Sequence, residues 1–200
     1  QKMLKKRQVN LITCHLGNGS SITAIKNGKS IDTTMGFTPL QGLMMGTRSG
    51  DIDPEIVAFL AKKERCSPDD IIRILNKKSG LLGIAGYSDV RTIHERAEKG
   101  DKAGTRALDM FTYRIMQYIG SYHGIIGGTD AIVFTAGIGE GAWYLRRDIC
   151  RSLAHLGIKL DGRRNRRHAS VITRPDSAIK VFVIPTNEEL MIAQETRARL

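Results

Sequence analysis

Two glycine-rich turns are the first places where this chain could bind an anion. One consists of His15, Leu16, Gly17, Asn18 and Gly19 and separates two predicted strands. The other, between a predicted strand and a predicted helix, consists of Gly137, Ile138, Gly139, Glu140 and Gly141. Backbone amides exposed in such turns can hold phosphate oxygens, and a helix start adds a partial positive charge. Each turn taken alone is more often just a turn, so phosphate binding is one of two hypotheses here.

A third segment, residues 45–53 (MGTRSGDID), places one arginine among glycines, hydroxyls and two carboxylates. The guanidinium of Arg48 can hold phosphoryl oxygens through two parallel hydrogen bonds. Equally, Asp51 or Asp53 can pair with Arg48, and Asp53 is expected to cap a helix that starts at Pro54. Both interpretations of Arg48 remain open at this point.

Residues 186–189 (TNEE) offer carboxylates where a predicted strand meets a predicted helix. Magnesium prefers one or two carboxylates, with water and phosphate completing its coordination shell. Acids that simply favour a helix start are the commoner explanation of such a string. The five histidines have no metal-ligand spacing and the three cysteines form no CxxC pair, which argues against a zinc site or a disulfide framework. Scattered cysteines favour a reducing, cytoplasmic compartment.

The chain is strongly basic, with 31 lysines and arginines against 20 acids and a net charge of +11. Such a charge attracts nucleic acids, acidic membranes or phosphorylated small molecules. No apolar stretch is long enough to span a bilayer. The most basic run, residues 163–168 (RRNRRH), contains no aromatic residue for base stacking, so a solvated loop is favoured over a nucleic-acid interface. Charge-driven nucleic-acid binding is nevertheless the rival hypothesis to phosphate chemistry.

The elements that must position these residues can be read from periodicity and turn signals. Strands are expected at 9–16, 20–26 and 29–33, as an antiparallel meander with two glycine turns, and buried strands at 130–135 and 178–184. Helices are expected from Pro54, from Ser67 to about Lys78, from Ser88-Asp89 to about Gly100, over 105–119, over 142–155, and after Thr186-Asn187. Residues 161–176 are expected to be irregular. The order predicts a single α/β or α+β domain with covered sheet faces.

Five strings together resemble the acetate and propionate kinase family of the actin-like ATPase superfamily. They are HLGNGSS, DTTMGFTPLQGLMMGTRSGDIDP, SGLLGIAGYSDVR, AIVFTAGIGE and VIPTNEELMIAQET, in the family's order and spacing. The resemblance implies an α/β domain of the actin-like ATPase (ribonuclease H-like) type, with a mixed sheet flanked by helices. It also implies reversible, Mg²⁺-dependent transfer of the ATP γ-phosphoryl group to acetate, giving acetyl phosphate and ADP, with propionate as the alternative acceptor.

The resemblance also assigns residues. It implies that the nucleotide phosphates contact His15–Gly19 and Gly137–Gly141, and that the adenosine contacts Asp89, Val90 and Arg91. Arg48 matches the arginine that stabilises the transferring phosphoryl group, and Glu188 matches the magnesium-linked glutamate. At Gly141 this chain departs from the family, which usually has Asn there.

The resemblance extends to domain organisation and partners. Residues 1–187 are expected to form a C-terminal nucleotide-binding domain, and residues 188–200 a terminal helix that packs on an N-terminal domain. In the family that domain carries the catalytic aspartate and an acetate-binding arginine, so this chain alone is expected to be inactive. Partners are expected to be ATP or ADP, acetate and a second copy in a homodimer, with no nucleic acid and no membrane. A non-catalytic dimerisation module is the alternative.

Overall fold

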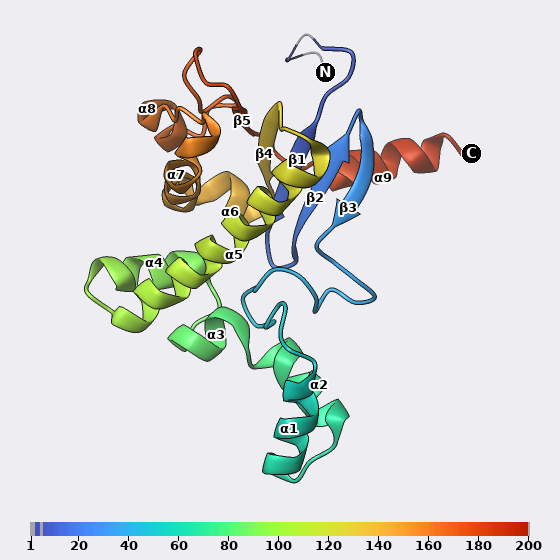
Figure 1. Ribbon diagram of the computed structural model, residues 1–200, viewed down its shortest axis with the longest axis vertical. Coiled ribbons are helices and arrows are strands. Elements are labelled where there is room, and N and C mark those ends of the chain that lie inside the picture. The colour runs from blue at the N-terminus through green and yellow to red at the C-terminus, as the bar shows by residue number, and fades with distance from the viewer. Residues whose placement is uncertain (1–2, 5, 200) are drawn as a thin grey trace.

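A five-stranded mixed sheet forms the centre of the computed structural model, which describes residues 3–4 and 6–199 (Figure 1). The strands are β1 (Leu11–Leu16), β2 (Ser20–Lys26), β3 (Lys29–Thr33), β4 (Ala131–Thr135) and β5 (Lys180–Val183). They lie in the order β3-β2-β1-β4-β5. The first three strands pair antiparallel, whereas β4 runs parallel to both β1 and β5. This is the mixed sheet that the resemblance implies.

The β2–β3 hairpin forms where the sequence predicts it. Asn27 and Gly28 both adopt positive φ, at 52° and 81°, as a two-residue hairpin turn requires. The expected bounds of β2 and β3 are confirmed, whereas β1 begins at Leu11 rather than at Val9.

Nine helices complete the described part of the chain. They are α1 (Glu55–Glu64), α2 (Pro68–Lys77), α3 (Gly80–Ala85), α4 (Val90–Glu98), α5 (Lys102–Ile126), α6 (Ala136–Gly141), α7 (Trp143–Ser152), α8 (Gly162–Arg166) and α9 (Glu188–Arg197). The expected helix over 142–155 is interrupted, because α7 ends at Ser152 and a 3₁₀ turn follows at Ala154–Leu156. The stretch expected to be irregular over 161–176 is also a correction, since it contains α8, an isolated bridge from Val171 to Phe182 of β5 and another from Thr173 to Leu160.

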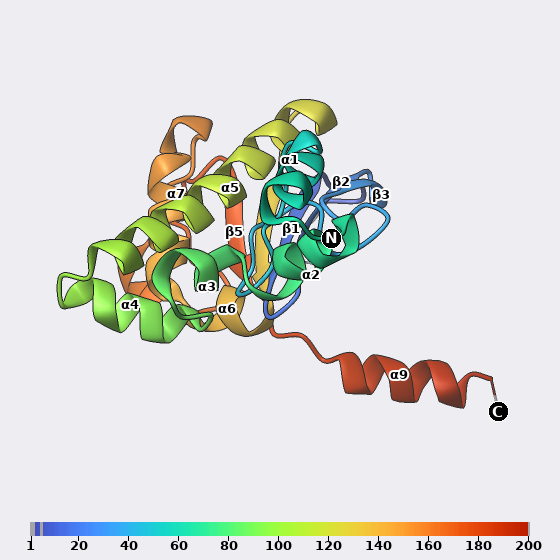
Figure 2. The ribbon, with the colours of Figure 1, turned by 90° about the horizontal axis from the view of Figure 1, so that it is seen from below.

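Helix α5 covers one face of the sheet. Its residues Ala107, Phe111, Ile115 and Ile119 recur every four positions and are all buried. It contacts β1, β2 and α7. Helix α5, which leads to β4, and helix α7, which lies between β4 and β5, therefore lie on the same side of the sheet (Figure 2). In β1 and β2 residues alternate between buried and half-buried, which shows that this face is better covered than the other. In β4 and β5 buried residues occur on both faces, so the expected covering of both faces is met there and is only partial at β1 and β2.

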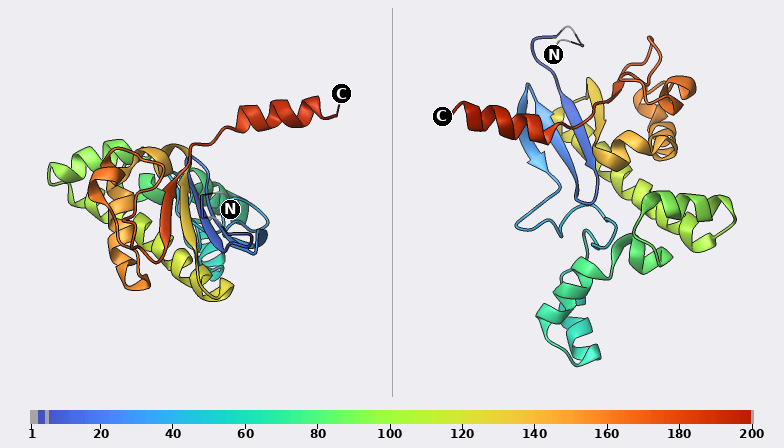
Figure 3. Two further views of the ribbon diagram at one scale, coloured as in Figure 1. Left: turned by 90° about the horizontal axis from the view of Figure 1, so that it is seen from above. Right: turned by 180° about the vertical axis from the view of Figure 1, so that it is seen from behind.

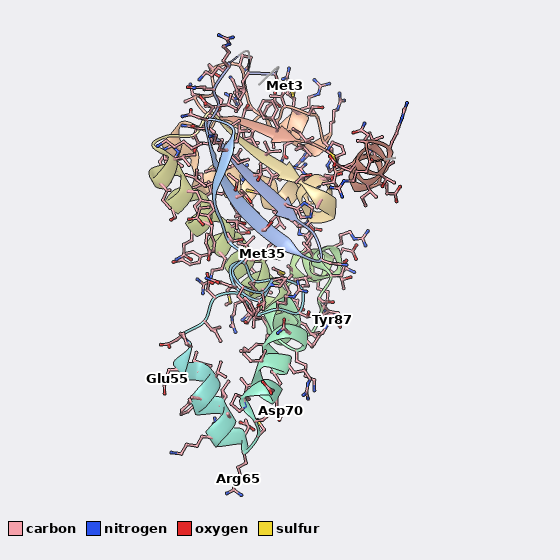
Figure 4. The ribbon with its side chains drawn as sticks, turned by 90° about the vertical axis from the view of Figure 1, so that its right-hand side faces the viewer. Met3, Met35, Glu55, Arg65, Asp70 and Tyr87 are labelled. Atoms are coloured by element: carbon pink, nitrogen blue, oxygen red, sulfur yellow. The ribbon has the colours of Figure 1, made fainter. Side chains whose placement is uncertain are left out.

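Helices α1 and α2 form a hairpin that projects from the body, with Arg65 at its tip (Figure 4). Ser67 and Asp70 close a capping box at the start of α2, the helix that the sequence predicts from Ser67. The Asp53 carboxylate accepts a hydrogen bond from the Glu55 amide at 3.0 Å, so Asp53 does cap the start of α1. No residue of α1 is buried, so this helix depends on α2 for its tertiary support.

Helix α9 extends away from the rest of the molecule (Figures 2 and 3). Its start is capped by Asn187, whose side-chain oxygen accepts a hydrogen bond from the Leu190 amide at 3.1 Å. Leu190, Met191 and Ile192 are all more than half exposed. An apolar surface of this kind is typical of a helix that packs against another chain or domain.

Candidate functional site

The first glycine turn connects β1 to β2 and is held by its own hydrogen bonds. The Gly17 amide donates to the Gly19 carbonyl oxygen at 3.1 Å, and the buried Ser20 hydroxyl donates to the Gly17 carbonyl oxygen at 3.1 Å. In the described part of the chain, the amides of Asn18 and Gly19 have no acceptor. The turn is therefore fixed while keeping donors available for an anion.

The second glycine segment differs from the expected loop, because residues 136–141 form the short helix α6 directly after β4. The change of direction takes place at Ala136, which has a φ of 64°, a left-handed conformation that costs an L-residue about 1 kcal/mol. A β-carbon at Gly17 would lie 3.5 Å from that of Ala136. Parallel pairing of β1 with β4 thus brings the two glycine segments into contact.

Buried Arg146 in α7 holds α6 in this position. Its Nη1 donates to the carbonyl oxygens of Gly139 and Glu140, at 2.7 and 2.6 Å. Its Nε donates to Oδ1 of the buried Asn165 at 2.9 Å. These bonds satisfy carbonyls at the end of α6 and connect α6 through α7 to α8.

The predicted contact segment Asp89, Val90 and Arg91 forms the start of helix α4. The Asp89 carboxylate accepts hydrogen bonds from the amides of Arg91 and Thr92, both at 3.0 Å. The bond from Thr92 is the main cause that lowers the pKa of Asp89 below its ordinary value. The Tyr144 hydroxyl donates to the Val90 carbonyl oxygen at 3.3 Å, which connects this segment to α7.

These three segments line one continuous cleft with two hollows. The smaller hollow, about 590 Å³, lies between His15, Gly19, Met35 and the turn at Thr186. The larger, about 830 Å³, lies between residues 88–91, Ile138 and Tyr144. Gly17, Asn18 and Gly137 line both hollows. The cleft is therefore centred on the contact between the two glycine segments.

Arg48 lies beside the first glycine turn, with Nη1 4.0 Å from the position of a β-carbon on Gly19. Neither carboxylate that could have paired with it does so: Asp51 accepts from the Gly42 amide, and Asp53 caps α1. The Arg48 guanidinium donates to Met45 Sδ at 3.4 Å and makes no ion pair within the described residues. The ion-pair interpretation is therefore wrong, and a half-buried cation faces the turn without a counter-charge.

The loop that carries Arg48 is held from two sides. Gly80, at φ 61°, packs so closely that a β-carbon there would lie 2.5 Å from the Arg48 carbonyl oxygen. On the other side, the Tyr118 hydroxyl of α5 donates to the second carboxylate oxygen of Asp51. Burial, more than any other cause, raises the pKa of Tyr118, so its hydroxyl stays protonated as a donor at neutral pH. Arg48 is thus presented by a rigid loop.

Glu140 connects α6 to the turn that precedes α9. Its carboxylate accepts a hydrogen bond from the Thr186 amide at 3.0 Å. Asn187 and Glu189 line the smaller hollow. The side chain of Glu188, the predicted magnesium ligand, lies outside the part of the chain that the structure describes.

Most of the predicted site residues meet at the cleft. Leu16, Gly139, Glu140 and Arg48 do not line it. Leu16 is in the core, Gly139 packs against β4, and the Glu140 carboxylate binds Thr186. Arg48 lies beside the turn, and its neighbours Gly46 and Thr47 line the larger hollow. A Cβ at Gly141 would meet nothing within 4 Å, so the position where the family usually has Asn is open.

Sequence reasoning missed Tyr144, which lines the larger hollow. Its ring stacks on that of His94, with centroids 3.5 Å apart, and the two planes are 13° from parallel. Burial is the main cause that raises the pKa of Tyr144 to about 12. A possible signal was its position three residues after Gly141 in a chain with few aromatic residues.

Comparisons with known proteins agree on one family. The sequence model of the Acetokinase family matches residues 1–194. The acetate kinase of Carboxydothermus hydrogenoformans is 57% identical over 191 residues, covering 94% of this chain and 48% of that protein. The crystal structure of Porphyromonas gingivalis acetate kinase matches with a TM-score of 0.91 and 43% identity, covering 96% of this chain and 49% of that one. A propionate kinase from Francisella tularensis matches with a TM-score of 0.92 and 47% identity, covering 97% and 50%. The chain spans about half the length of the curated relatives it matches.

Proposed function

Because this chain belongs to the acetokinase family, we propose that it is the nucleotide-binding part of a phosphotransferase that moves the γ-phosphoryl group between ATP and acetate. Acetate is proposed as the acceptor because the similar curated proteins are named acetate kinases, and propionate is the second candidate because a propionate kinase structure is also similar. Its three cysteines are free thiols, which supports a reducing cytoplasm as the compartment. Within the described residues, no helix has the length and apolar character needed to cross a membrane.

The observation that carries this proposal is the cleft itself, where segments far apart in sequence converge on Gly17, Asn18 and Gly137. We assign the phosphates to this centre, where backbone amides of Asn18 and Gly19 lack protein acceptors. The larger hollow, between residues 88–91 and Tyr144, is the proposed site of the adenosine. The lining of this hollow is more apolar than that of the smaller hollow, which suits burial of the adenine base.

Arg48 is proposed to stabilise the phosphoryl group during transfer. Phosphoryl transfer depends mostly on positioning and on neutralising charge, with little covalent work by the protein. A guanidinium without a carboxylate partner, held by a rigid loop beside the phosphate turn, suits this role. An ion pair with Asp51 or Asp53 would have reduced its attraction for a phosphoryl group.

The turn before α9 fits a magnesium ion by its donor chemistry. Mg²⁺ needs only one or two protein carboxylates when phosphates and water supply the remaining oxygens. Glu189 lines the hollow next to the phosphate turn, and Glu188, the proposed ligand, precedes it at the start of α9. The ion would neutralise phosphate charge and help to orient the nucleotide.

We further propose that residues 1–187 form the nucleotide-binding domain and that α9 packs on a second domain. The exposed Leu190, Met191 and Ile192 support this arrangement. The whole enzyme is proposed to be a homodimer, and the exposed Phe59 and Ile72 of the α1–α2 hairpin are candidates for the contact. Because the relatives are about twice as long, residues 1–200 alone are expected to bind nucleotide without catalysing transfer.

Thermal unfolding with and without Mg-ADP tests the nucleotide proposal. Ligand at 100 times its dissociation constant adds about 2.7 kcal/mol, or roughly 5 to 10 °C for a domain of this size. In Gly137→Leu the new side chain meets no protein atom near its β-carbon but enters the cleft, so the fold is expected to persist while the ADP shift is lost.

The matched control is Gly120→Leu, on the exposed side of α5, where a β-carbon also meets nothing within 4 Å. It is expected to keep the full ADP shift. An unchanged melting temperature with ADP in the unmodified chain would contradict the nucleotide proposal and favour the non-catalytic dimerisation module. Coupled assays with acetate and propionate on the full-length enzyme then test the acceptor.

A further inference from the structure

A groove rich in arginine lies between α7, α8 and the segment before β5, and none of the proposed nucleotide contacts belongs to it. Its volume is about 670 Å³, and it shares no lining residue with either hollow of the cleft. Figure 1 shows α7 and α8 side by side, away from the β1–β2 turn. Six arginines line the groove: Arg147, Arg151, Arg163, Arg166, Arg167 and Arg174.

The charge of this groove is largely uncompensated. Of the six arginines, only Arg147 makes an ion pair within the described residues, with Asp148 at 2.7 Å. The nearby Asp161 caps α8 through the amides of Arg163 and Arg164 and pairs with the Arg164 side chain at 3.7 Å, outside the groove lining. Four guanidiniums therefore surround the hollow without carboxylate partners, and Arg174 makes no ion pair but interacts electrostatically with Asp161 and Asp176. The excess of arginines concentrates positive potential there.

The wall of the groove is well fixed. Two guanidinium groups pack over the Trp143 ring, that of Arg147 at 5.4 Å and that of Arg166 at 4.9 Å from the ring centroid. Buried Asn165 donates to the Trp143 carbonyl oxygen at 2.8 Å and accepts from Arg146. A fixed wall reduces the conformational entropy that ligand binding would otherwise cost.

We propose that this groove binds a compact phosphate anhydride carrying three or more negative charges. Guanidinium groups match phosphate oxygens with paired hydrogen bonds, and several of them around one hollow favour a multivalent anion over a monovalent one. A small ligand suits a hollow of about 670 Å³. A nucleic acid would need free aromatic faces for stacking, and guanidiniums pack against the Trp143 ring.

Calorimetric titration with inorganic tripolyphosphate tests this proposal. The groove variant combines Arg163→Gln, Arg167→Gln and Arg174→Gln, three exposed side chains that make no hydrogen bond in the described structure. The control carries the same charge change on the projecting hairpin: Lys62→Gln, Lys63→Gln and Lys77→Gln. Gly137→Leu, which blocks the nucleotide cleft, separates binding in the groove from binding at the proposed phosphate site.

Tripolyphosphate is expected to bind the Gly137→Leu protein, and adding the groove substitutions is expected to weaken that binding at least tenfold. Adding the hairpin substitutions should change it less than twofold. An equal loss of tripolyphosphate affinity in both combinations would show that only net charge matters and would overturn the proposal. Undiminished binding by the groove variant would also overturn it. Tighter binding of a single-stranded oligonucleotide at the same salt concentration would assign the groove to nucleic acid instead. Should the triple variant fail to unfold cooperatively, the single charge reversal Arg167→Glu provides the same comparison.

Discussion

The buried guanidinium of Arg146 donates a hydrogen bond to the Gly139 carbonyl oxygen at 2.7 Å. This bond joins α7 to α6, the short helix whose residue Gly137 lines both hollows of the cleft. Burial lowers the pKa of Arg146 to about 10. Because this pKa is still well above 7, the side chain remains a charged donor at neutral pH. The position of α6 thus depends on a residue that does not itself line the cleft.

Arg146→Met is expected to destabilise the protein by about 3 kcal/mol, because the buried Gly139 carbonyl oxygen and Asn165 Oδ1 each lose the hydrogen bond that Arg146 donates. Denaturant unfolding measures this cost. Arg151→Met, on an exposed position of the same helix, should change the free energy of unfolding by less than about 0.5 kcal/mol. Equal effects of the two substitutions would show that the hydrogen bonds of Arg146 do not stabilise α6.

Tyr144→Phe is expected to cost about 1 kcal/mol of stability, because the Val90 carbonyl oxygen loses its donor. It should also weaken ADP binding several-fold, because residues 88–91 lose their connection to α7 beside the larger hollow. Tyr122→Phe is the matched control: its hydroxyl also donates over 3.3 Å, to Asp32, away from the cleft. Titration calorimetry should find its ADP affinity unchanged, and a similar loss in both variants would contradict the positioning role of Tyr144.

Tyr118→Phe removes the donor to Asp51, the residue that also accepts from the Gly42 amide. A hydrogen bond to a charged acceptor contributes about 1.5 to 3 kcal/mol, so a loss in this range is expected. Hydrogen exchange should accelerate at the amides of Gly42 and Asp51, which belong to the loop that presents Arg48. Tyr113→Phe, at an exposed position of the same helix, should leave exchange in this loop unchanged.

Asp89 predicts a pH dependence of stability. Its pKa is lowered in the folded state, mainly by the hydrogen bond from the Thr92 amide. Its stabilising contribution is therefore fully present above its unfolded pKa of about 3.9 and is lost as the pH falls through the lower folded pKa. Asp89→Ala should be less stable than the unmodified chain at pH 7 by about 1 kcal/mol, the usual cost of losing a helix cap. Urea unfolding between pH 7 and pH 3 should show this difference shrinking toward the acid end; a constant difference would rule out the charge of Asp89 as its origin.

The sequence by itself determined the local elements. The hairpin turn between the strands 20–26 and 29–33, the helix expected from Ser67 and the apolar helix expected over 105–119 all lie where they were predicted. Each depends on contacts within a few residues, because turn conformations and helix caps are set by neighbouring side chains and amides. The motifs were also sufficient to identify the family that the comparisons found.

Only the tertiary structure decided which partners these residues have. Sequence left open whether Arg48 pairs with Asp51 or Asp53. In the fold neither pair forms, because Asp51 accepts a hydrogen bond from Tyr118 and Asp53 accepts one from the start of α1. It also brings to the cleft Tyr144, which the sequence analysis did not select.

The arginine run at 163–168 is a second case in which the sequence could not decide the surroundings of its side chains. Sequence favoured a solvated loop, yet residues 163–166 of the run lie in α8. Arg163, Arg166 and Arg167 line a groove together with arginines of α7 and Arg174. Local signals extend over a few residues, whereas ion pairing, burial and the shape of a hollow depend on segments that meet only when β4 and β5 add to the sheet in parallel. Sequence therefore specified the pieces and their chemistry, and long-range pairing decided which charges are neutralised and which remain available to a ligand.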